Sequence, residues 1–381
     1  MRTFYEFFAG GGMARAGLGE GWQCLFANDF DAKKAASYVT NWGSDDMVRE
    51  DVAKLTSEDL PGQADLAWAS FPCQDLSLAG AGAGLKGERS GTFWPFWKLM
   101  LALKEQKRAP RLIVLENVTG ALTSHEGKDF SAICSALSRA GYRFGAVVAN
   151  AVNFVPQSRP RLFIIAVASS VSVPGNLESD GPVEPWHSTA LKEAFQKVPK
   201  THRPKWIWWN LPTPPQRETV FADLIEERPT GVKWHTQEET KKLLGMMSDL
   251  HLNKVKAAQK SGEIKVGTIY RRTRPDGKGG RVQRAEVRFD DIAGCLRTPA
   301  GGSSRQVIMV VKGRSVRSRL LSSREAARLM GLPDSYELPA RYNDAYHLTG
   351  DGVVVPVVRF LAEQILEPIL ASGDIASKRA A

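Results

Sequence analysis

The stretch that decides the fold is "TFYEFFAGGGMARAG", residues 3–17. Its apolar start predicts a strand over 3–8, its run of three glycines at 10–12 predicts a tight turn, and a helical pattern over 13–20 follows directly. Such a turn lets a ligand approach the backbone closely, because glycine has no side chain in the way. The stretch therefore predicts the first strand, ligand-binding loop and helix of an α/β domain.

This glycine loop differs from two common nucleotide-binding patterns. A dinucleotide fingerprint would need a third glycine at position 15, where the chain has Arg15, and no G-x-x-x-x-G-K-S/T phosphate cradle occurs. Two acids follow instead: Asp29 ends the next predicted strand, where it can accept from ribose hydroxyls, and Asp51 follows a further short apolar segment. The set favours a nucleoside-like ligand without a pyrophosphate, with S-adenosylmethionine as the obvious candidate. A tight turn with helix-capping acids is the alternative.

The same alternation of strands and helices continues through the first 170 residues. Five further apolar runs predict strands, at 24–28, 65–70, 111–116, 145–150 and 161–168. Helical patterns between them predict helices at 31–41, 93–107 and 128–140. The fold class is therefore α/β, a parallel sheet with crossover helices. We expect a cofactor-binding and catalytic domain over 1–169, completed by about 345–381.

The rhythm changes after Ser169. Residues 170–253 mix loop-like, proline-rich and tryptophan-rich pieces, and from 254 onward basic, glycine-rich and short β-prone pieces follow. We therefore expect a second, smaller, irregular and β-rich domain over 170–315. Helical patterns return at 323–331 and at about 354–371, and residues 316–344 are expected to form a hinge.

The charge of the chain is concentrated in one segment. The formal net charge is +10, and residues 254–324 hold 18 Lys and Arg against 5 Asp and Glu. The rest of the chain is slightly acidic, so this segment carries the whole excess. A basic surface of this kind is typical of polyanion binding, with a merely solvated face as the alternative.

The composition excludes several classes of protein. No stretch approaches 18 uninterrupted apolar residues, and the N-terminus lacks the pattern of a signal peptide. The four cysteines are scattered, without metal-ligand spacing, so we expect neither a disulfide framework nor a metal site. A reducing cytoplasm is the expected location.

One cysteine has unusual neighbours. Cys73 stands between Pro72 and Gln74, directly after the apolar run at 65–70. The proline stiffens the loop and places the thiol at the carboxyl end of a strand, where open α/β sheets bind ligands. This position favours a nucleophile, and an inert buried cysteine is the alternative.

With these motifs in order, the chain resembles the DNA cytosine-5 methyltransferase family, in its stand-alone bacterial or phage form. The resemblance spans the protein: "FAGGG" (8–12), "PCQ" (72–74), "ENV" (116–118), "QSRPR" (157–161), "RLLSSREAARLMGLP" (319–333) and "GDGVVVP" (350–356) match family motifs. One position departs from the pattern, since the family usually has Asn where this chain has Asp351. The resemblance implies a Rossmann-like S-adenosylmethionine-dependent domain and a target-recognition domain.

The resemblance also implies the reaction and its residues. A thiolate at Cys73 would add to carbon 6 of cytosine and so activate carbon 5 towards the methyl group. Glu116, protonated, would donate to ring nitrogen 3, which requires a raised pKa. Arg159 and Arg161 are expected on one side of an extended segment, supporting the cytosine and its phosphate. A structural ion pair is the alternative for Arg161.

The remaining implied sites bind the cofactor and DNA. The cofactor residues are Phe8, Gly10, Gly12, Asp29, Asp51, Pro72 and Asp351. A second interpretation of Asp351 is that it caps the helix that begins near Val353. The expected DNA contacts are Gln74, Ser77, Arg89, Arg271, Arg272, Arg274, Arg297, Ser303 and Arg305, with Arg288 and Ser304 as further candidates.

We expect this enzyme to flip its target base out of duplex DNA, with 77–93 as a mobile lid. It is expected to act as a monomer on DNA, and a cognate restriction endonuclease is a candidate partner. A DNA-binding module without turnover and an RNA cytosine methyltransferase remain alternatives. An amino-group methyltransferase is disfavoured, because no D/N/S-P-P-Y/F/W tetrapeptide occurs.

Overall fold

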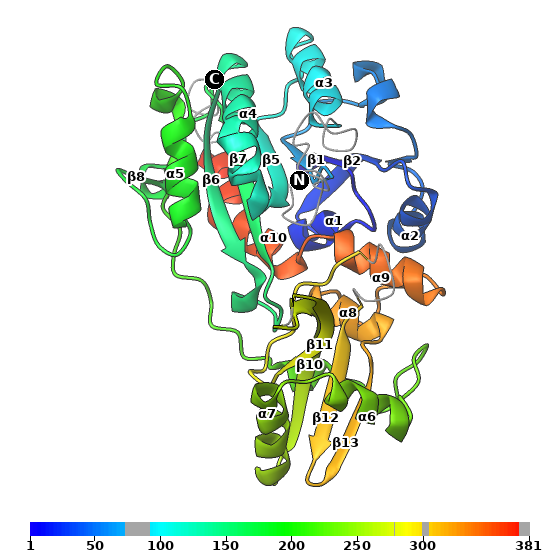
Figure 1. Ribbon diagram of the computed structural model, residues 1–381. Helices are drawn as coiled ribbons and strands as arrows, with labels where there is room; N and C mark the ends of the chain where they lie inside the picture. The colour runs from blue at the N-terminus through cyan, green and yellow to red at the C-terminus, as the bar shows by residue number, and fades with distance from the viewer. Residues whose placement is uncertain (73–91, 278, 299–304, 373–381) are drawn as a thin grey trace. The chain divides into compact units, whose positions relative to one another are not determined.

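The computed structural model describes residues 1–72, 92–277, 279–298 and 305–372 (Figure 1). The chain divides into two compact units. Unit 1 comprises 1–150, 160–214 and the chain from Val353 onward, and unit 2 comprises 151–159 and 215–352. No helix in the described ranges is both long and apolar enough to cross a membrane.

Unit 1 is built on a seven-stranded sheet in the order β3-β2-β1-β4-β5-β7-β6. The strands from β1 to β5 run parallel, whereas β7 runs antiparallel to both of its neighbours. All six strands expected in this region are present, and the expected parallel sheet is confirmed apart from the direction of β7. The strands are β1 (Arg2–Phe7), β2 (Trp22–Asn28), β3 (Met47–Val48), β4 (Leu66–Ala69), β5 (Leu112–Val118), β6 (Tyr142–Asn150) and β7 (Pro160–Ala168).

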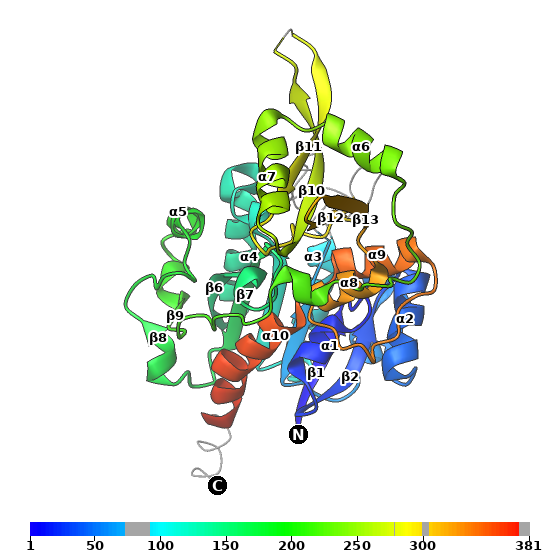
Figure 2. The same cartoon turned by 90° about the horizontal axis from the view of Figure 1, so that it is seen from below.

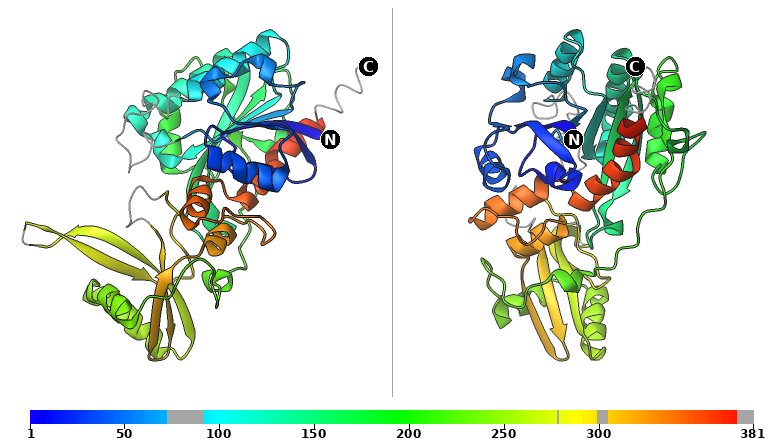
Figure 3. Two further views of the ribbon diagram at one scale, coloured as in Figure 1. Left: turned by 90° about the vertical axis from the view of Figure 1, so that its right-hand side faces the viewer. Right: turned by 180° about the vertical axis from the view of Figure 1, so that it is seen from behind.

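Helices cover both faces of this sheet. In Figure 3, left, α3 and α4 lie on one face, and α1 and α10 lie on the other. Asp31 begins α2, because its carboxylate accepts from the backbone N–H groups of Lys33 and Lys34. The helices of unit 1 are α1 (Met13–Leu18), α2 (Ala32–Trp42), α3 (Phe93–Glu105), α4 (Lys128–Arg139), α5 (Thr189–Lys197) and α10 (Val355–Leu361), which continues as a π-helical turn (Ala362–Leu366).

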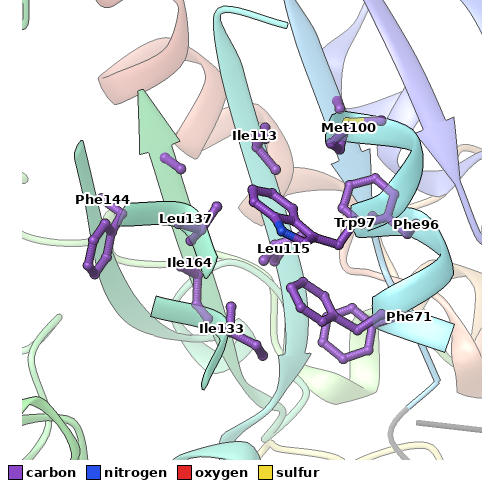
Figure 4. Close-up of a cluster of buried hydrophobic side chains, with 14 of the residues drawn as sticks. Phe71, Phe96, Trp97, Met100, Ile113, Leu115, Ile133, Leu137, Phe144 and Ile164 are labelled. Carbon is purple, nitrogen blue, oxygen red and sulfur yellow. The ribbon is translucent and has the colours of Figure 1, made fainter. Parts of the chain in front are cut away.

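The core of unit 1 determines which side chains of β1 and β5 face the helices α3 and α4. Alternate residues of β1 and β5, such as Phe7 and Leu115, join side chains from α3 and α4 in one buried cluster (Figure 4). Phe96 contacts Phe7 with ring centroids 5.0 Å apart. Because neighbouring residues of a strand face opposite ways, the same packing turns Glu6 of β1 to the other face.

Residues 170–214 belong to unit 1, although the sequence analysis assigned them to the smaller domain. They add to the far edge of the sheet: the Val148 N–H donates to the Trp186 carbonyl at 2.8 Å, and the Ile207 N–H donates to the Phe144 carbonyl at 2.7 Å. Trp206 packs against Phe144 with centroids 5.7 Å apart. The same region forms a small two-stranded sheet of β8 (Glu178–Ser179) and β9 (Trp208–Trp209).

Unit 2 contains a regular four-stranded antiparallel sheet in the order β11-β10-β12-β13 (Figure 2). The irregular β-rich domain of the sequence analysis is therefore more regular than expected. Helices α6 and α7 close one face, where Leu243 and Val255 pack with Ile269, Val287 and other strand residues. The elements are α6 (Gln237–Gly245), α7 (Asp249–Lys260), β10 (Ile264–Pro275), β11 (Arg281–Arg288), β12 (Val307–Lys312) and β13 (Ser315–Leu320).

Residues 316–352 also lie in unit 2, which differs from the expected hinge at 316–344 and from the expected return to the large domain at about 345. Strand β13 supplies Arg319, which pairs with Glu325 of α8 (Ser323–Leu329) at 2.6 Å, with both side chains fully buried. Helix α9 (Tyr342–Asp351) is tied to the same unit, because the Tyr346 hydroxyl accepts from the Gln306 N–H at 2.9 Å. These contacts make the segment part of the framework of unit 2.

Candidate active site

The glycine loop after β1 adopts the backbone that the sequence required. Phe8, Gly10 and Gly12 have φ of 57°, 56° and 76°, all in the left-handed region that favours glycine. The Gly10 N–H donates to Asp29 Oδ2 at 2.9 Å, and the other oxygen of Asp29 accepts from the Asp31 N–H at 2.9 Å. Asp29 is 6% exposed, and this burial raises its pKa. The carboxylate of Asp29 therefore braces the loop at the end of β2.

Asp51 lies at the end of the neighbouring strand segment. Its side chain accepts from the Ala53 N–H at 2.9 Å and caps a short 3-10 turn, Val52–Lys54, and it is exposed. Asn28, which the sequence analysis did not single out, is buried and donates to the carbonyls of Val48 and Glu50 at 3.0 and 2.8 Å. Asn28 thus fixes the backbone directly before Asp51. Its signal in the sequence is only its position beside Asp29.

A buried polar cluster lies beneath the glycine loop. Arg15, at the position where a dinucleotide fingerprint would have glycine, donates to the Tyr38 hydroxyl at 2.7 Å and to Asp46 at 2.6 Å. Glu6 is 1% exposed, and burial raises its pKa to about 8, opposed by backbone N–H groups of Arg15 and Ala14. Trp42 donates to the Gly11 carbonyl at 3.0 Å. The cluster supports the glycine loop on its buried side. It could not be predicted from the sequence, because its members are far apart along the chain.

Two glycines of this loop make a matched pair for a test. A Cβ on Gly12 would lie 2.3 Å from Trp42 Nε1, whereas a Cβ on Gly10 would meet nothing within 4 Å. Both substitutions incur the left-handed backbone penalty of about 1–2 kcal/mol, and only Gly12→Ala adds overpacking of about 1–3 kcal/mol. We expect denaturant unfolding to show the larger loss of stability for Gly12→Ala, and calorimetry to show weaker cofactor binding for both variants. Equal losses for the two variants would contradict this account of the loop.

Glu116 and Arg161 meet at the ends of two neighbouring strands. Glu116 of β5 and Arg161 of β7 form an ion pair with Oε1 and Nε 3.2 Å apart, and their side chains are 8% and 16% exposed. Glu116 lies at the carboxyl end of its strand, and Arg161 lies near the amino end of the antiparallel β7, so the two reach the same edge. The structure therefore brings together two of the expected catalytic residues, and the ion pair foreseen as the alternative for Arg161 is present.

Asn117 connects this pair to the segment of the nucleophile. Its Nδ2 donates to the carbonyl of Phe71 at 3.3 Å, and its Oδ1 accepts from the Val118 N–H at 2.8 Å. Phe71 is two residues before Cys73, and Pro72, which is half-buried, stands between them. Cys73 itself lies outside the described residues. The described chain thus leads from β4 to a point held by Asn117, the neighbour of Glu116 in the sequence.

Arg159 does not share the surroundings of Arg161. It precedes β7 and belongs to unit 2, where it donates to the carbonyls of Leu296, Gly350 and Gly352 at 3.0, 2.9 and 2.7 Å. It is 1% exposed. The two arginines therefore have different partners: Arg159 joins three backbone carbonyls, whereas Arg161 pairs with Glu116. The expected role of Arg159 in supporting the cytosine stays a prediction.

Asp351 is the last residue of α9 and lies in unit 2. Its Oδ1 accepts from the Thr298 hydroxyl, and the side chain is exposed. The interpretation of Asp351 as a helix cap is wrong: α10 begins at Val355, and its N-cap is Val354. The carboxylate binds a threonine instead of the free N–H groups of a helix.

Some of the expected DNA contacts lie in the described part of the chain and the others lie outside it. Arg271, Arg272 and Arg274 lie on β10, and Arg305 donates to Asn343 at 2.6 Å and stacks over Tyr342. Arg297 is exposed. The others, Gln74, Ser77, Arg89, Ser303 and Ser304, lie outside the described residues. Within the described ranges, no group of three or more His, Cys, Asp or Glu side chains is placed to hold a metal ion.

Comparison with known proteins decides the family. The chain matches the family described as "C-5 cytosine-specific DNA methylase" over residues 2–367. The chain belongs to this family. This methylase therefore transfers a methyl group to carbon 5 of cytosine in DNA, and the family's chemistry depends on S-adenosylmethionine.

The relatives of this methylase extend over the whole chain. It is 25% identical to the Type II methyltransferase M.HpaII of Haemophilus parainfluenzae, covering 96% of this chain and 90% of the relative. It is 23% identical to the Type II methyltransferase M.HhaI of Haemophilus parahaemolyticus, covering 95% and 93%. The solved structure of S. pombe Dnmt2 methyltransferase matches with a TM-score of 0.57 at 18% identity, covering 97% of this chain and 99% of that one. This last likeness shows the fold.

Proposed function

We propose that this methylase uses Cys73 as a covalent nucleophile and Glu116 as the acid that assists it. The observation that carries the proposal is the buried Glu116–Arg161 pair, beside which Asn117 holds the chain at Phe71, two residues before Cys73. Glu116 of β5, Arg161 of β7 and the Phe71 carbonyl after β4 come from three segments that meet at one edge of the sheet of unit 1. At this edge of open α/β sheets, ligands bind.

The proposed reaction begins at carbon 6 of cytosine. The Cys73 thiolate adds to carbon 6 while Glu116 donates a proton to ring nitrogen 3, so that carbon 5 gains the electron density of an enamine. After methyl transfer, a water molecule takes the proton from carbon 5 and the thiolate leaves carbon 6, while nitrogen 3 returns its proton to Glu116, which restores the aromatic ring and the acid. Arg161 supports Glu116 and holds its carboxyl group in place, since the fork of a guanidinium fixes an oxygen acceptor.

The glycine loop fits the expected methyl donor. Gly10 has open space where a Cβ would lie, and the loop is braced by Asp29 at the end of β2, so that a ligand can approach the backbone there. S-adenosylmethionine, when bound, supplies an electrophilic methyl group. We propose that Phe8, Gly10 and Gly12 form its backbone cradle, that Asp29 and Asp51 accept from its nucleoside, and that Pro72 lines the same site. A direct role of Asp351 stays a prediction.

We further propose that unit 2 recognises the DNA sequence, and that the enzyme flips the target base as a monomer on DNA. The +13 segment at 254–324 supports an electrostatic contact with the phosphate backbone. The Type II relatives support a role in protecting bacterial DNA from a partner endonuclease, in the cytoplasm of a bacterium or a phage-infected cell.

The position of the transferred methyl group tests this proposal. Unmethylated duplex DNA is incubated with the purified protein and S-adenosylmethionine, then treated with bisulfite and sequenced. We expect cytosines protected from conversion in one sequence context, and 5-methylcytosine as the methylated nucleoside by mass spectrometry. Methylation of RNA alone, or tight DNA binding without any methyl transfer, would overturn the proposal in favour of its alternatives.

A further inference from the structure

Strands β10 and β11 continue as a two-stranded ribbon beyond the rest of the sheet of unit 2 (Figure 3, left). β12 pairs with β10 only from Ile264 to Ile269, whereas β11 pairs with β10 from Thr268 to Pro275. Among the residues that the structure describes, the segment from Tyr270 to Pro275 therefore has one strand partner. At about 3.4 Å per residue it spans close to 20 Å.

The two faces of this ribbon differ in what they carry. Residues that pair directly across an antiparallel ladder project to the same face. One face, here called the clamp face, holds Tyr270, Arg272, Arg274, Val282, Arg284 and Glu286. The other, the back face, holds Arg271, Thr273, Pro275, Arg281 and Gln283, and continues towards the sheet face where Ile269 and Val287 join the core of unit 2.

A single carboxylate organises the clamp face. Glu286 Oε1 lies 2.6 Å from Arg274 Nε, and Glu286 Oε2 lies 3.6 Å from Arg272 Nε. Arg272 also lies over the Tyr270 ring, 5.1 Å from its centroid. The hydrogen bond from Arg274 lowers the pKa of Glu286, so the acid stays ionised. Glu286 therefore pairs with both guanidinium groups, by a hydrogen bond to Arg274 Nε and by a longer ion pair to Arg272 Nε.

A depression lies on the clamp face at the end of the ribbon nearest the rest of the sheet. It has a volume of about 330 Å³ and is lined by Tyr270, Arg272, Glu286 and Arg288, together with Arg297 and Lys254. Several cations thus surround a concave surface on this side of the ribbon. The major groove of B-DNA, about 12 Å wide, admits a two-stranded β-ribbon, and an arginine fork reads guanine there through O6 and N7.

We propose that the clamp face of the β10–β11 ribbon reads guanine in the major groove, and that Glu286 is a positioning residue that orients Arg272 and Arg274 for this readout. The proposal rests on the assignment of target recognition to unit 2. It also sorts the arginines of the ribbon: those of the clamp face specify sequence, and Arg271 and Arg281 of the back face supply only phosphate attraction.

Matched glutamine variants of the two faces test this inference. The probes are the duplex that contains the methylated sequence of the wild type and its single-base variants. Arg274→Gln should weaken binding to the cognate duplex roughly 5- to 150-fold and relax the sequence requirement at one guanine. Arg271→Gln and Arg281→Gln should weaken binding to all duplexes alike and reduce the salt slope by about 0.9 each.

Glu286→Gln tests whether Glu286 positions the two arginines or only stabilises the fold of unit 2. We expect it to broaden the set of methylated sequences while nonspecific DNA affinity stays the same or rises, because an acid is removed from a cationic surface. An unchanged melting temperature keeps this readout interpretable, and Glu286→Asp serves as the conservative variant, with partial return of specificity. An unchanged methylated sequence in both Arg274→Gln and Glu286→Gln would overturn the inference. Failure of the proposed function would show differently, as wild-type protein that makes no 5-methylcytosine.

Discussion

Cys73→Ser is expected to lower methyl transfer by on the order of a thousand-fold or more, because a serine hydroxyl is hardly ionised at neutral pH and is a poor nucleophile and leaving group. The substitution replaces one sulfur by oxygen, so the fold of unit 1 and DNA binding should persist. The measurement is transfer of labelled methyl groups from S-adenosylmethionine to DNA under single-turnover conditions.

The scattered cysteines of the chain provide the control. Cys134→Ser changes a fully buried thiol of α4, so a loss of stability is expected, with methyl transfer per folded molecule retained. Wild-type rates in Cys73→Ser would exclude covalent catalysis through this residue.

Glu116→Gln is expected to lower kcat by about 10²- to 10⁴-fold, the range for loss of a positioned general acid. Glutamine keeps the size of the side chain and can still donate a hydrogen bond, but it cannot transfer a proton to ring nitrogen 3. The ion pair with Arg161 at 3.2 Å is lost as well. Rates measured across pH should lose the limb that reports protonation of Glu116.

The partner of the pair supplies the comparison for this prediction. Arg161→Gln removes the same ion pair and leaves the acid in place, so it isolates the contribution of the pair from that of the proton. We expect a smaller loss of kcat in Arg161→Gln than in Glu116→Gln. Equal losses in both variants, with the pH profile unchanged in shape, would assign Glu116 a structural role only.

The strands and helices of unit 1 could be predicted because their signals are local. Each central strand is a short apolar run. Asp29 and Glu116 could be predicted as site residues because each comes at or near the end of such a strand. The direction of β7 could not be predicted, since an apolar run carries no information about the strand beside it. The same holds for Arg159, whose carbonyl partners lie 137 to 193 residues away along the chain.

The regular sheet of unit 2 could not be predicted, because part of it lacks the apolar pattern of a strand. The outer half of β10, Tyr270 to Pro275, is rich in arginine and mostly exposed, so it lacks the apolar period that predicts a strand. Pairing with β11 is what makes it a strand. Residues 170–214 were misassigned for a related reason, because proline and tryptophan obscure the contacts with β6 that join them to unit 1.

Covalent trapping tests the central claim most directly. Duplex DNA with 5-fluorocytosine at the methylated position cannot lose fluorine after methyl transfer, so the thiolate cannot leave carbon 6. We predict a denaturation-resistant protein–DNA adduct with wild-type protein and S-adenosylmethionine, located by peptide mass analysis at Cys73, and no adduct with Cys73→Ser. An adduct that persists in Cys73→Ser, or that maps to another residue, would contradict the account.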